Sequence, residues 1–423
     1  MQATSSGAPL SARKAWTVAI VATLVMSVSY IDRQALAALA PTVCKALVIS
    51  DTQYGWLVAS FSFAYLLGAP LAGALLDRVG ARRGLVMAVL AWSAVAASHA
   101  LVPTFGVFVA LRVGLGLTEA PSFPGAAQSM RRVLPREHRS AGFGMLFTGS
   151  SVGGMLAVPL VIALNHWMGW RVAFLLTAAI GLSWIPVWLV ATSDPHIKDV
   201  LARMPSAEDD PTATREPASR WSLLASPAVL RAVMLVCFSA PALMFGINWS
   251  SKYLAHEFAL SQDALARYLW VPMVLFDLGA VGFGAIASRI DAGVLRANPA
   301  AERRSHVLLI VIGGVLGGTI AAVPLVHSPW LATGLISTTM AGGGALFALL
   351  TADMLARVHP SHVSTAAGLT ASAQSLAYVV AGPLVGRAFD AAHSYSGVLL
   401  VLGAIVPPAA LAWCVWPMPR STK

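Results

Sequence analysis

The stretch G-A-L-L-D-R-V-G-A-R-R at residues 73–83 joins two long apolar runs through a short basic turn. Gly80 permits a tight change of direction, and Asp77 can lie at the positive, N-terminal end of a neighbouring helix. The basic residues of the stretch are typical of a loop that faces the cytoplasm: Arg78, Arg82 and Arg83. From these residues alone, the stretch is either a specific structural device or a basic loop that only sets membrane topology.

The composition excludes an ordinary water-soluble protein. The chain has 423 residues, of which 57% are hydrophobic and 11% are charged, and its mean hydropathy is +0.73. In soluble domains about a quarter of the residues are charged, so this composition indicates a polytopic membrane protein. The net charge of +10 comes from Lys and Arg in short connections between apolar runs, which indicates membrane topology and argues against a nucleic-acid partner.

The apolar runs predict an all-α fold with about twelve membrane spans, each of roughly 20 residues. They lie near residues 15–40, 53–76, 84–103, 105–129, 140–164, 170–192, 228–254, 266–289, 306–326, 330–355, 363–389 and 395–417. Basic residues are concentrated in every second connection, which predicts that both termini are cytoplasmic.

A polar segment at residues 193–227 divides the spans into two groups. Its composition cannot bury a core of its own, so we expect a cytoplasmic linker between two six-helix halves, residues 15–192 and 228–417. Residues 1–14 and 418–423 are then cytoplasmic tails. Two such repeats predict a substrate site at their interface near the bilayer midplane.

Two acids and two arginines lie inside the N-terminal apolar runs: Asp32, Arg33, Arg112 and Glu119. Ionisable groups within a membrane are costly and indicate function by default. Arg112 and Glu119 are two helical turns apart, roughly 10.5 Å along one helix face. A static ion pair between helices is the structural alternative, but a buried pair is weak evidence for a stabilising role.

The 73–83 stretch resembles the signature loop of the major facilitator superfamily, G-x-x-x-D-R-x-G-R-R, with Ala81 as a mild departure. Several further strings are similar to the anion:cation symporter branch of that superfamily, which includes hexuronate, galactonate and vesicular glutamate carriers. They are Y-I-D-R-Q at 30–34, D-T-Q-Y-G-W-L at 51–57, R-V-G-L-G-L-T-E-A-P-S-F-P at 112–124 and W-S-S-K-Y-L at 249–254.

The resemblance implies a twelve-helix carrier that works by alternating access. The residues that match the family's conformational latch are Asp77, Arg78, Gly80, Arg82 and Arg83. The residues that match the branch's proton-coupling acids are Asp32 and Glu119, and those that match its anion-recognising residues are Arg33 and Arg112.

The expected substrate pocket has fewer polar groups than a carrier for sugar acids needs. Tyr30 and Tyr65 are candidate pocket residues, although packing is the alternative for each. Ser151 stands where a galactonate-type carrier has glutamine, and Ala371 or Ser372 stands where it has asparagine. The predicted span at 330–355 contains G-G-G-A-L-F-A-L-L at 342–350, with few hydroxyl groups. Each buried hydroxyl left unpaired costs about 1–3 kcal/mol. We therefore expect a less hydroxylated carboxylate, such as a small or aromatic monocarboxylate.

The C-terminal half carries few charges in its apolar runs. We expect Asp277 to form a hydrogen bond between helices and Asp353 to lie near the cytoplasmic end of its span. Lys252 is expected to extend to the membrane interface, as long basic side chains do. The polar residues expected nearest the C-terminal side of the pocket are Asn248, Ser372 and Gln374.

Together these features predict a proton-coupled symporter for a small organic anion in a bacterial inner membrane. We expect it to act as a monomer among lipids, with the proton as coupling ion and with no cofactor, metal or nucleic acid. The alternatives are a drug/proton or anion-exchange antiporter and a transporter-like membrane sensor. No P-loop or zinc signature occurs, which argues against an ATP-driven pump, and the absence of a nucleophile constellation argues against an intramembrane enzyme.

Overall fold

The computed structural model describes residues 10–202, 225–294, 299–357 and 363–416, apart from some side chains within these ranges, including that of Asp77. Helices dominate these ranges, and the part of the chain described contains no strand. The predicted tails lie mostly outside the described residues, as does much of the predicted linker.

The chain divides into two compact units, each described here by itself. Unit 1 consists of Met1–Leu36 and Ala64–Asp209, and unit 2 consists of Ala37–Phe63 and Asp210–Lys423. The boundary therefore cuts through the first two long helices as well as the predicted linker. Residues 37–63 belong to the unit that holds the C-terminal helices.

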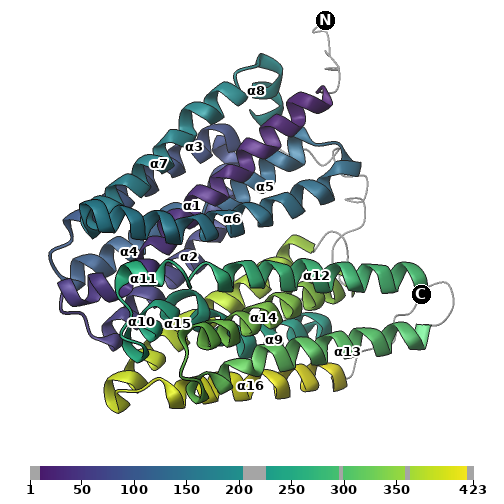
Figure 1. Ribbon diagram of the computed structural model, residues 1–423. Helices are drawn as coiled ribbons and strands as arrows, with labels where there is room; N and C mark the ends of the chain where they lie inside the picture. Colours follow the sequence, from purple (N-terminus) through teal and green to yellow (C-terminus); the bar gives the residue numbers. More distant parts are fainter. Residues whose placement is uncertain (1–9, 203–224, 295–298, 358–362, 417–423) are drawn as a thin grey trace, which may run out of the picture. The chain divides into compact units, whose positions relative to one another are not determined.

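Two helices contribute to both units, and the remaining N-terminal helices belong to unit 1 (Figure 1). The shared helices are α1 (Ala12–Ala46) and α2 (Asp51–Val79). Unit 1 also holds α3 (Ala81–Ser98), the 3-10 turn η1 (His99–Leu101), α4 (Phe105–Glu119), α5 (Ser122–Val133), α6 (Arg136–Met168), α7 (Trp170–Ala191) and α8 (Pro195–Ala202).

Unit 2 contains the other helices, among which α12, α13, α14 and α16 run side by side in Figure 1. In chain order they are α9 (Pro227–Met244), the π-helical turn η4 (Phe245–Trp249), α10 (Ser250–Glu257), α11 (Gln262–Leu265), α12 (Val271–Val294), α13 (Pro299–Gly318), the 3-10 segment η5 (Thr319–Leu325), α14 (Pro329–Arg357), α15 (Val363–Ala392) and α16 (Ser396–Val415).

Apolar runs of this length become helices because a helix satisfies its own backbone hydrogen bonds where lipid offers no partner. Every predicted span falls on a helical segment. Among the described residues, nine helices are long and apolar enough to cross a membrane, and Val271–Ala287 is a shorter apolar helix. A membrane protein is therefore confirmed, whereas the number of twelve spans stays a prediction.

The predicted span at 105–129 is divided into two helices. α4 ends at Glu119 and α5 begins at Ser122. Pro121 lies between them, and proline both lacks a backbone N–H and crowds the preceding turn. The break places Glu119 at the last position of α4, where its side chain is buried.

Gly80 forms the tight turn that the sequence predicts between α2 and α3. Its φ is +82°, a conformation that glycine adopts without strain. The start of α3 is tied to the end of α7, because Arg82 Nε donates to Thr192 Oγ1 at 3.0 Å and Trp188 Nε1 donates to the Arg82 carbonyl at 3.1 Å. Arg82 is thus engaged within unit 1.

The predicted linker begins with a helix that the sequence analysis did not expect. Ile197 and Leu201 of α8 are buried, and α8 packs on α3 and α5. Asp194 accepts from His196 N at 2.9 Å at the start of α8 and pairs with Lys14 Nζ at 2.5 Å. The hydrogen bond from Lys14 holds the pKa of Asp194 below its usual value. The beginning of the linker is therefore attached to unit 1.

Close helix packing explains the glycine cluster of the tenth predicted span. A Cβ on Gly342 would lie 2.3 Å from the backbone N of Gly317, and one on Gly344 would lie 2.1 Å from the carbonyl O of Phe276. A Cβ on Gly343 would meet Leu243 at 2.2 Å. These glycines let α14 approach α13, α12 and α9, so the scarcity of hydroxyl groups here reflects packing and says little about a substrate.

A similar contact between α1 and α6 makes a stability prediction. A Cβ on Gly153 would lie 2.2 Å from the carbonyl O of Ser27. We expect Gly153→Ala to destabilise the protein by about 1–3 kcal/mol through overpacking and to lower the Tm of the detergent-purified chain. Gly106→Ala is the control because nothing lies within 4 Å of its Cβ position. Equal Tm values for the two variants would contradict the close contact.

Candidate functional site

The centre of the candidate site in unit 1 is an ion pair between α1 and α4. Arg33 donates to Glu119 Oε2 from Nε at 3.2 Å and from Nη2 at 3.0 Å. Ser29 Oγ donates to the same oxygen at 3.0 Å. The side chain of Glu119 is 0% exposed, and its other oxygen, Oε1, has no hydrogen-bond partner among the described residues. One carboxylate oxygen is therefore fully engaged and the other is free.

The two candidate tyrosines flank the guanidinium of Arg33. Its Cζ lies 4.6 Å from the ring centroid of Tyr30 and 4.8 Å from that of Tyr65. These distances fit cation–π contacts, which strengthen when the cation is removed from water. The structure thus gathers Tyr30, Arg33, Tyr65 and Glu119 into one cluster, as a binding role requires.

Asp32 points away from this cluster, toward α3 and α7. A Cβ on Gly181 of α7 would lie 3.6 Å from Asp32 Oδ2. Asp32 is 3% exposed, and neither of its carboxylate oxygens has a hydrogen-bond partner among the described residues. Trp92 and Thr177 lie nearby without hydrogen-bond geometry to it. An ionised carboxylate here is desolvated without compensation.

Arg112 shares a buried face of α4 with Glu119, as the spacing predicts. The arginine that donates to Glu119 in the structure is Arg33 of α1, and the separate roles expected of Arg112 and Glu119 stay predictions. Arg112 is 4% exposed and acts electrostatically on His99, a buried histidine whose Nδ1 lies 2.8 Å from the Val95 carbonyl. The helix period correctly predicted the shared buried face of Arg112 and Glu119, and the hydrogen-bond partner of Glu119 comes from α1.

The remaining predicted site residues are distributed over both units. Ser151 is half-buried on α6 in unit 1, and Ser372 is half-buried on α15 in unit 2. Their participation in a common substrate site stays a prediction. Arg78 and Arg83 of the predicted latch are exposed. The side chain of Asp77 lies outside the described residues, so the latch also stays a prediction.

Asp353 in unit 2 belongs to an ionic cluster near the C-terminal end of α14. It accepts from Arg357 Nη2 at 2.9 Å and pairs with Arg231 of α9. The Arg231 guanidinium also lies over the ring of Trp413 at 3.8 Å. This cluster ties α9, α14 and α16 together. Gln374 lies on α15, where its Nε2 donates to Tyr378 OH at 3.3 Å.

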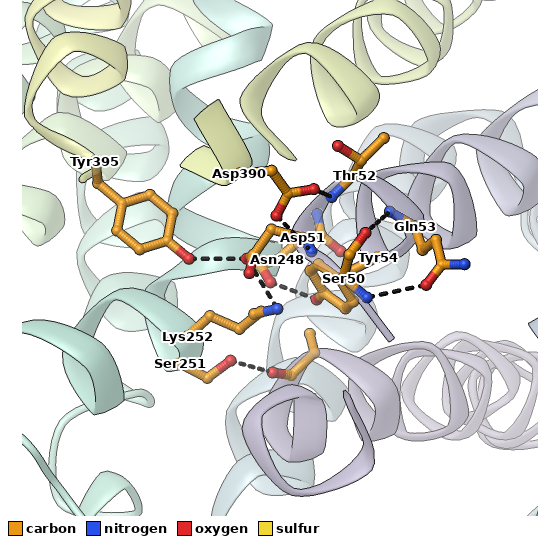
Figure 2. A network of polar contacts seen from close by, with 11 residues as sticks. Ser50, Asp51, Thr52, Gln53, Tyr54, Asn248, Ser251, Lys252, Asp390 and Tyr395 are labelled. Carbon is orange, nitrogen blue, oxygen red and sulfur yellow. Dashed lines mark hydrogen bonds and ion pairs between the residues drawn. The ribbon is translucent and has the colours of Figure 1, made fainter. Parts of the chain in front are cut away.

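Lys252 forms an ion pair that was not predicted from the sequence, and its place relative to a membrane interface stays a prediction. Its Nζ lies 2.8 Å from Asp51 Oδ1, and the two side chains are 10% and 14% exposed. Figure 2 shows this pair inside a larger network at the start of α2, which also includes Asp390 and Tyr395. The sequence analysis missed it, although D-T-Q-Y-G-W-L and W-S-S-K-Y-L, which supply Asp51 and Lys252, were both singled out as family strings.

Comparisons with known proteins agree with these features. A family model described as "Major Facilitator Superfamily" matches residues 22–382. The chain is 27% identical over 326 residues to a galacturonate transporter of Dickeya chrysanthemi, covering 75% of this chain and 93% of that protein. It is 26% identical over 408 residues to a hexuronate transporter of Escherichia coli (strain K12), covering 92% of each.

A solved structure shares the fold. It is described as a bacterial homolog to the human lysosomal transporter Spinster in an inward-facing and unoccupied conformation, with a TM-score of 0.74 and 17% identity. The match covers 96% of this chain and 95% of that one. The helical fold, the apolar spans and the family match together lead to one conclusion. The chain belongs to the Major Facilitator Superfamily and is a membrane transporter, not an enzyme.

Proposed function

We propose that the chain is a proton-coupled symporter that imports an organic anion by alternating access. The observation that carries the proposal is the buried pair of Arg33 and Glu119, because a substrate carboxylate can replace the carboxylate of Glu119. The relatives named for galacturonate and hexuronate support an organic acid as the substrate class.

Arg33 supplies the positive charge for the substrate. A guanidinium binds a carboxylate through charge-assisted N–H donors, and in the structure both Nε and Nη2 are occupied by Glu119 Oε2. A proton on the free oxygen Oε1 makes Glu119 neutral and weakens its hold on Arg33. Proton binding to Glu119 therefore strengthens anion binding to Arg33. By thermodynamic linkage, anion binding strengthens proton binding by the same factor.

Asp32 is the second proton carrier in this proposal. Its carboxyl group is buried without a hydrogen-bond partner among the described residues, and a protonated acid has no net charge to bury. Because Asp32 and Arg33 are consecutive on α1, a small movement of this helix displaces both groups. A change in the charge of Asp32 therefore affects the position of α1, the helix that also carries Arg33.

The proposed substrate is a carboxylate with fewer hydroxyl groups than a hexuronate. The support is the presence of Ser151 and of Ala371 or Ser372 where a galactonate-type carrier has longer amides. The glycine cluster on α14 no longer supports this part of the proposal, since its residues serve packing. The relatives' sugar-acid substrates are the competing expectation.

We further propose a bacterial inner-membrane location with cytoplasmic termini, a monomeric unit and no cofactor apart from the coupling proton. The concentration of arginines in alternate connections supports the cytoplasmic position of the termini. An antiporter with the same fold is the alternative. The notable cases are a drug/proton antiporter and an anion exchanger. A drug/proton antiporter moves protons in the opposite direction to its substrate, so the sign of proton flux on adding candidate acids distinguishes symport from antiport.

Glu119→Gln is expected to abolish accumulation driven by a pH gradient while leaving exchange of labelled for unlabelled substrate intact. Gln is neutral at every pH, so it cannot gain or lose the coupling proton. Uptake and counterflow in proteoliposomes measure the two activities. Glu257→Gln, a change at an acid that is not in the α1–α4 cluster, is the control. Full gradient-driven accumulation by Glu119→Gln would refute the coupling role.

The substrate class is tested by uptake of a panel of labelled carboxylates into proteoliposomes with an imposed pH gradient. We expect short-chain and aromatic monocarboxylates to be taken up in preference to galactonate and hexuronates. The physical reason is that a sparsely polar pocket leaves several substrate hydroxyls unpaired. Preferential uptake of a hexuronate would overturn the substrate proposal without affecting the coupling mechanism.

A further inference from the structure

Within unit 2, the beginning of α2 is bound to α15 by a carboxylate from a distant part of the chain. Asp390 of α15 accepts from the backbone N of Asp51 at 3.1 Å through Oδ1 and from the backbone N of Thr52 at 2.9 Å through Oδ2 (Figure 2). The first N–H groups of a helix have no partner within it, and a negative charge there is stabilised by the helix dipole.

α2 also has a local cap that does not involve α15. Ser50 N donates to Gln53 Oε1 at 2.9 Å, and Gln53 N donates to Ser50 Oγ at 3.2 Å. This reciprocal arrangement is a capping box. Since it lies entirely within residues 50–53, it persists if α2 leaves α15. The carboxylate of Asp390 therefore acts as a tie between helices, and α2 does not need it in order to begin.

The side chain of Asp51 makes a second set of contacts. Its Oδ1 accepts from Tyr395 OH at 3.0 Å and pairs with Lys252 Nζ at 2.8 Å. A tyrosine phenol is protonated at neutral pH, so Tyr395 acts as the donor in this contact. Lys252 also lies 5.1 Å from the ring centroid of Tyr54, whose OH donates to the Asn248 carbonyl at 2.5 Å.

The end of α1, which also belongs to unit 2, is held by α10 through a carbonyl that lacks its helical donor because of a proline. Pro41 has no N–H, so the carbonyl of Ala37 lacks its usual helical donor. Ser251 Oγ donates to that carbonyl at 2.5 Å. Gln262 Nε2 donates to the neighbouring carbonyl of Ala38 at 2.7 Å. The polar ties therefore involve both ends of the α1–α2 connection.

Glycines bring the α2 and α15 backbones into direct contact beneath these ties. A Cβ on Gly386 would lie 2.1 Å from the carbonyl O of Asp51, and a Cβ on Gly55 would lie 2.3 Å from the carbonyl O of Gly382. A side chain at these positions forces the helices apart. The polar contacts and the close backbone packing thus both favour the arrangement in which α2 lies against α15.

We propose that Asp51, Lys252, Asp390 and Tyr395, named here the α2 clasp, are the outer gate of the carrier. The inference rests on the proposed function. With a cytoplasmic N-terminus, the connections that carry these residues face outward, and an outward-open state requires α2 to leave α10 and α15. Opening breaks the Asp51 and Lys252 pair and the cap from Asp390, so the clasp sets how often the outer side opens.

Cys44 is a native reporter for this opening, because it is buried on α1 within residues 37–46 of unit 2. The test uses the full chain with Cys237→Ser and Cys414→Ser, reconstituted in liposomes, and a membrane-impermeant maleimide added outside. We expect Asp390→Asn to increase the rate of Cys44 labelling by about tenfold, the effect of weakening one charge-assisted contact. Glu257→Gln, an acid outside the clasp, should leave the rate unchanged.

Exchanging the charges of Asp51 and Lys252 distinguishes a gating role from simple misfolding. Asp51→Lys and Lys252→Asp should each increase labelling, and the double variant should return it toward the starting rate because the pair is re-formed with reversed charges. The gating role would be contradicted by an unchanged rate of Cys44 labelling in Asp390→Asn. It would also be contradicted if the double variant were labelled as fast as the single variants. Altered labelling without proton-coupled uptake would instead reject the proposed function and retain the gate.

Discussion

The buried ion pair between Arg33 and Glu119 is the interaction on which the account of this transporter depends. Charges removed from water need partners, and a buried pair gains little net stability from its own attraction. Here the cost is reduced by Ser29, which donates to Glu119, and by the rings of Tyr30 and Tyr65 beside Arg33. A buried guanidinium with several supporting contacts can exchange one carboxylate partner for another. The proposed mechanism requires this of Arg33, whose partner changes from Glu119 to a substrate carboxylate.

Helix α1 connects this charge cluster with the α2 clasp. Residues up to Leu36 belong to unit 1, and Ala37–Ala46 belong to unit 2. Arg33 and the carbonyl of Ala37 are thus one helical turn apart on the same element, the first in the proposed anion site and the second bound by Ser251. In the proposed cycle, a change in the charge of Asp32 or Glu119 acts on a helix that is already held at the outer gate.

Much of this organisation follows from the sequence. Uncompensated charges in apolar runs identified Asp32, Arg33, Arg112 and Glu119, and helix geometry predicted the common buried face of the last two. Sequence spacing did not reveal that Glu119 binds Arg33, because partners on different helices depend on packing. The partner of Lys252 was missed for the same reason, since nothing local in the sequence indicates that Asp51 lies beside it. The α14 glycines were interpreted as a sparse pocket because close backbone approach is visible only in the structure.

The central claim is that a proton and a carboxylate bind together because both act on the pair of Arg33 and Glu119. Proton exchange on adding a transported carboxylate to the purified protein in weakly buffered solution tests it most directly. We expect proton uptake on binding in the wild type, and none in Glu119→Gln at a site still able to bind the anion. Proton release on binding, or equal uptake by both proteins, would contradict it.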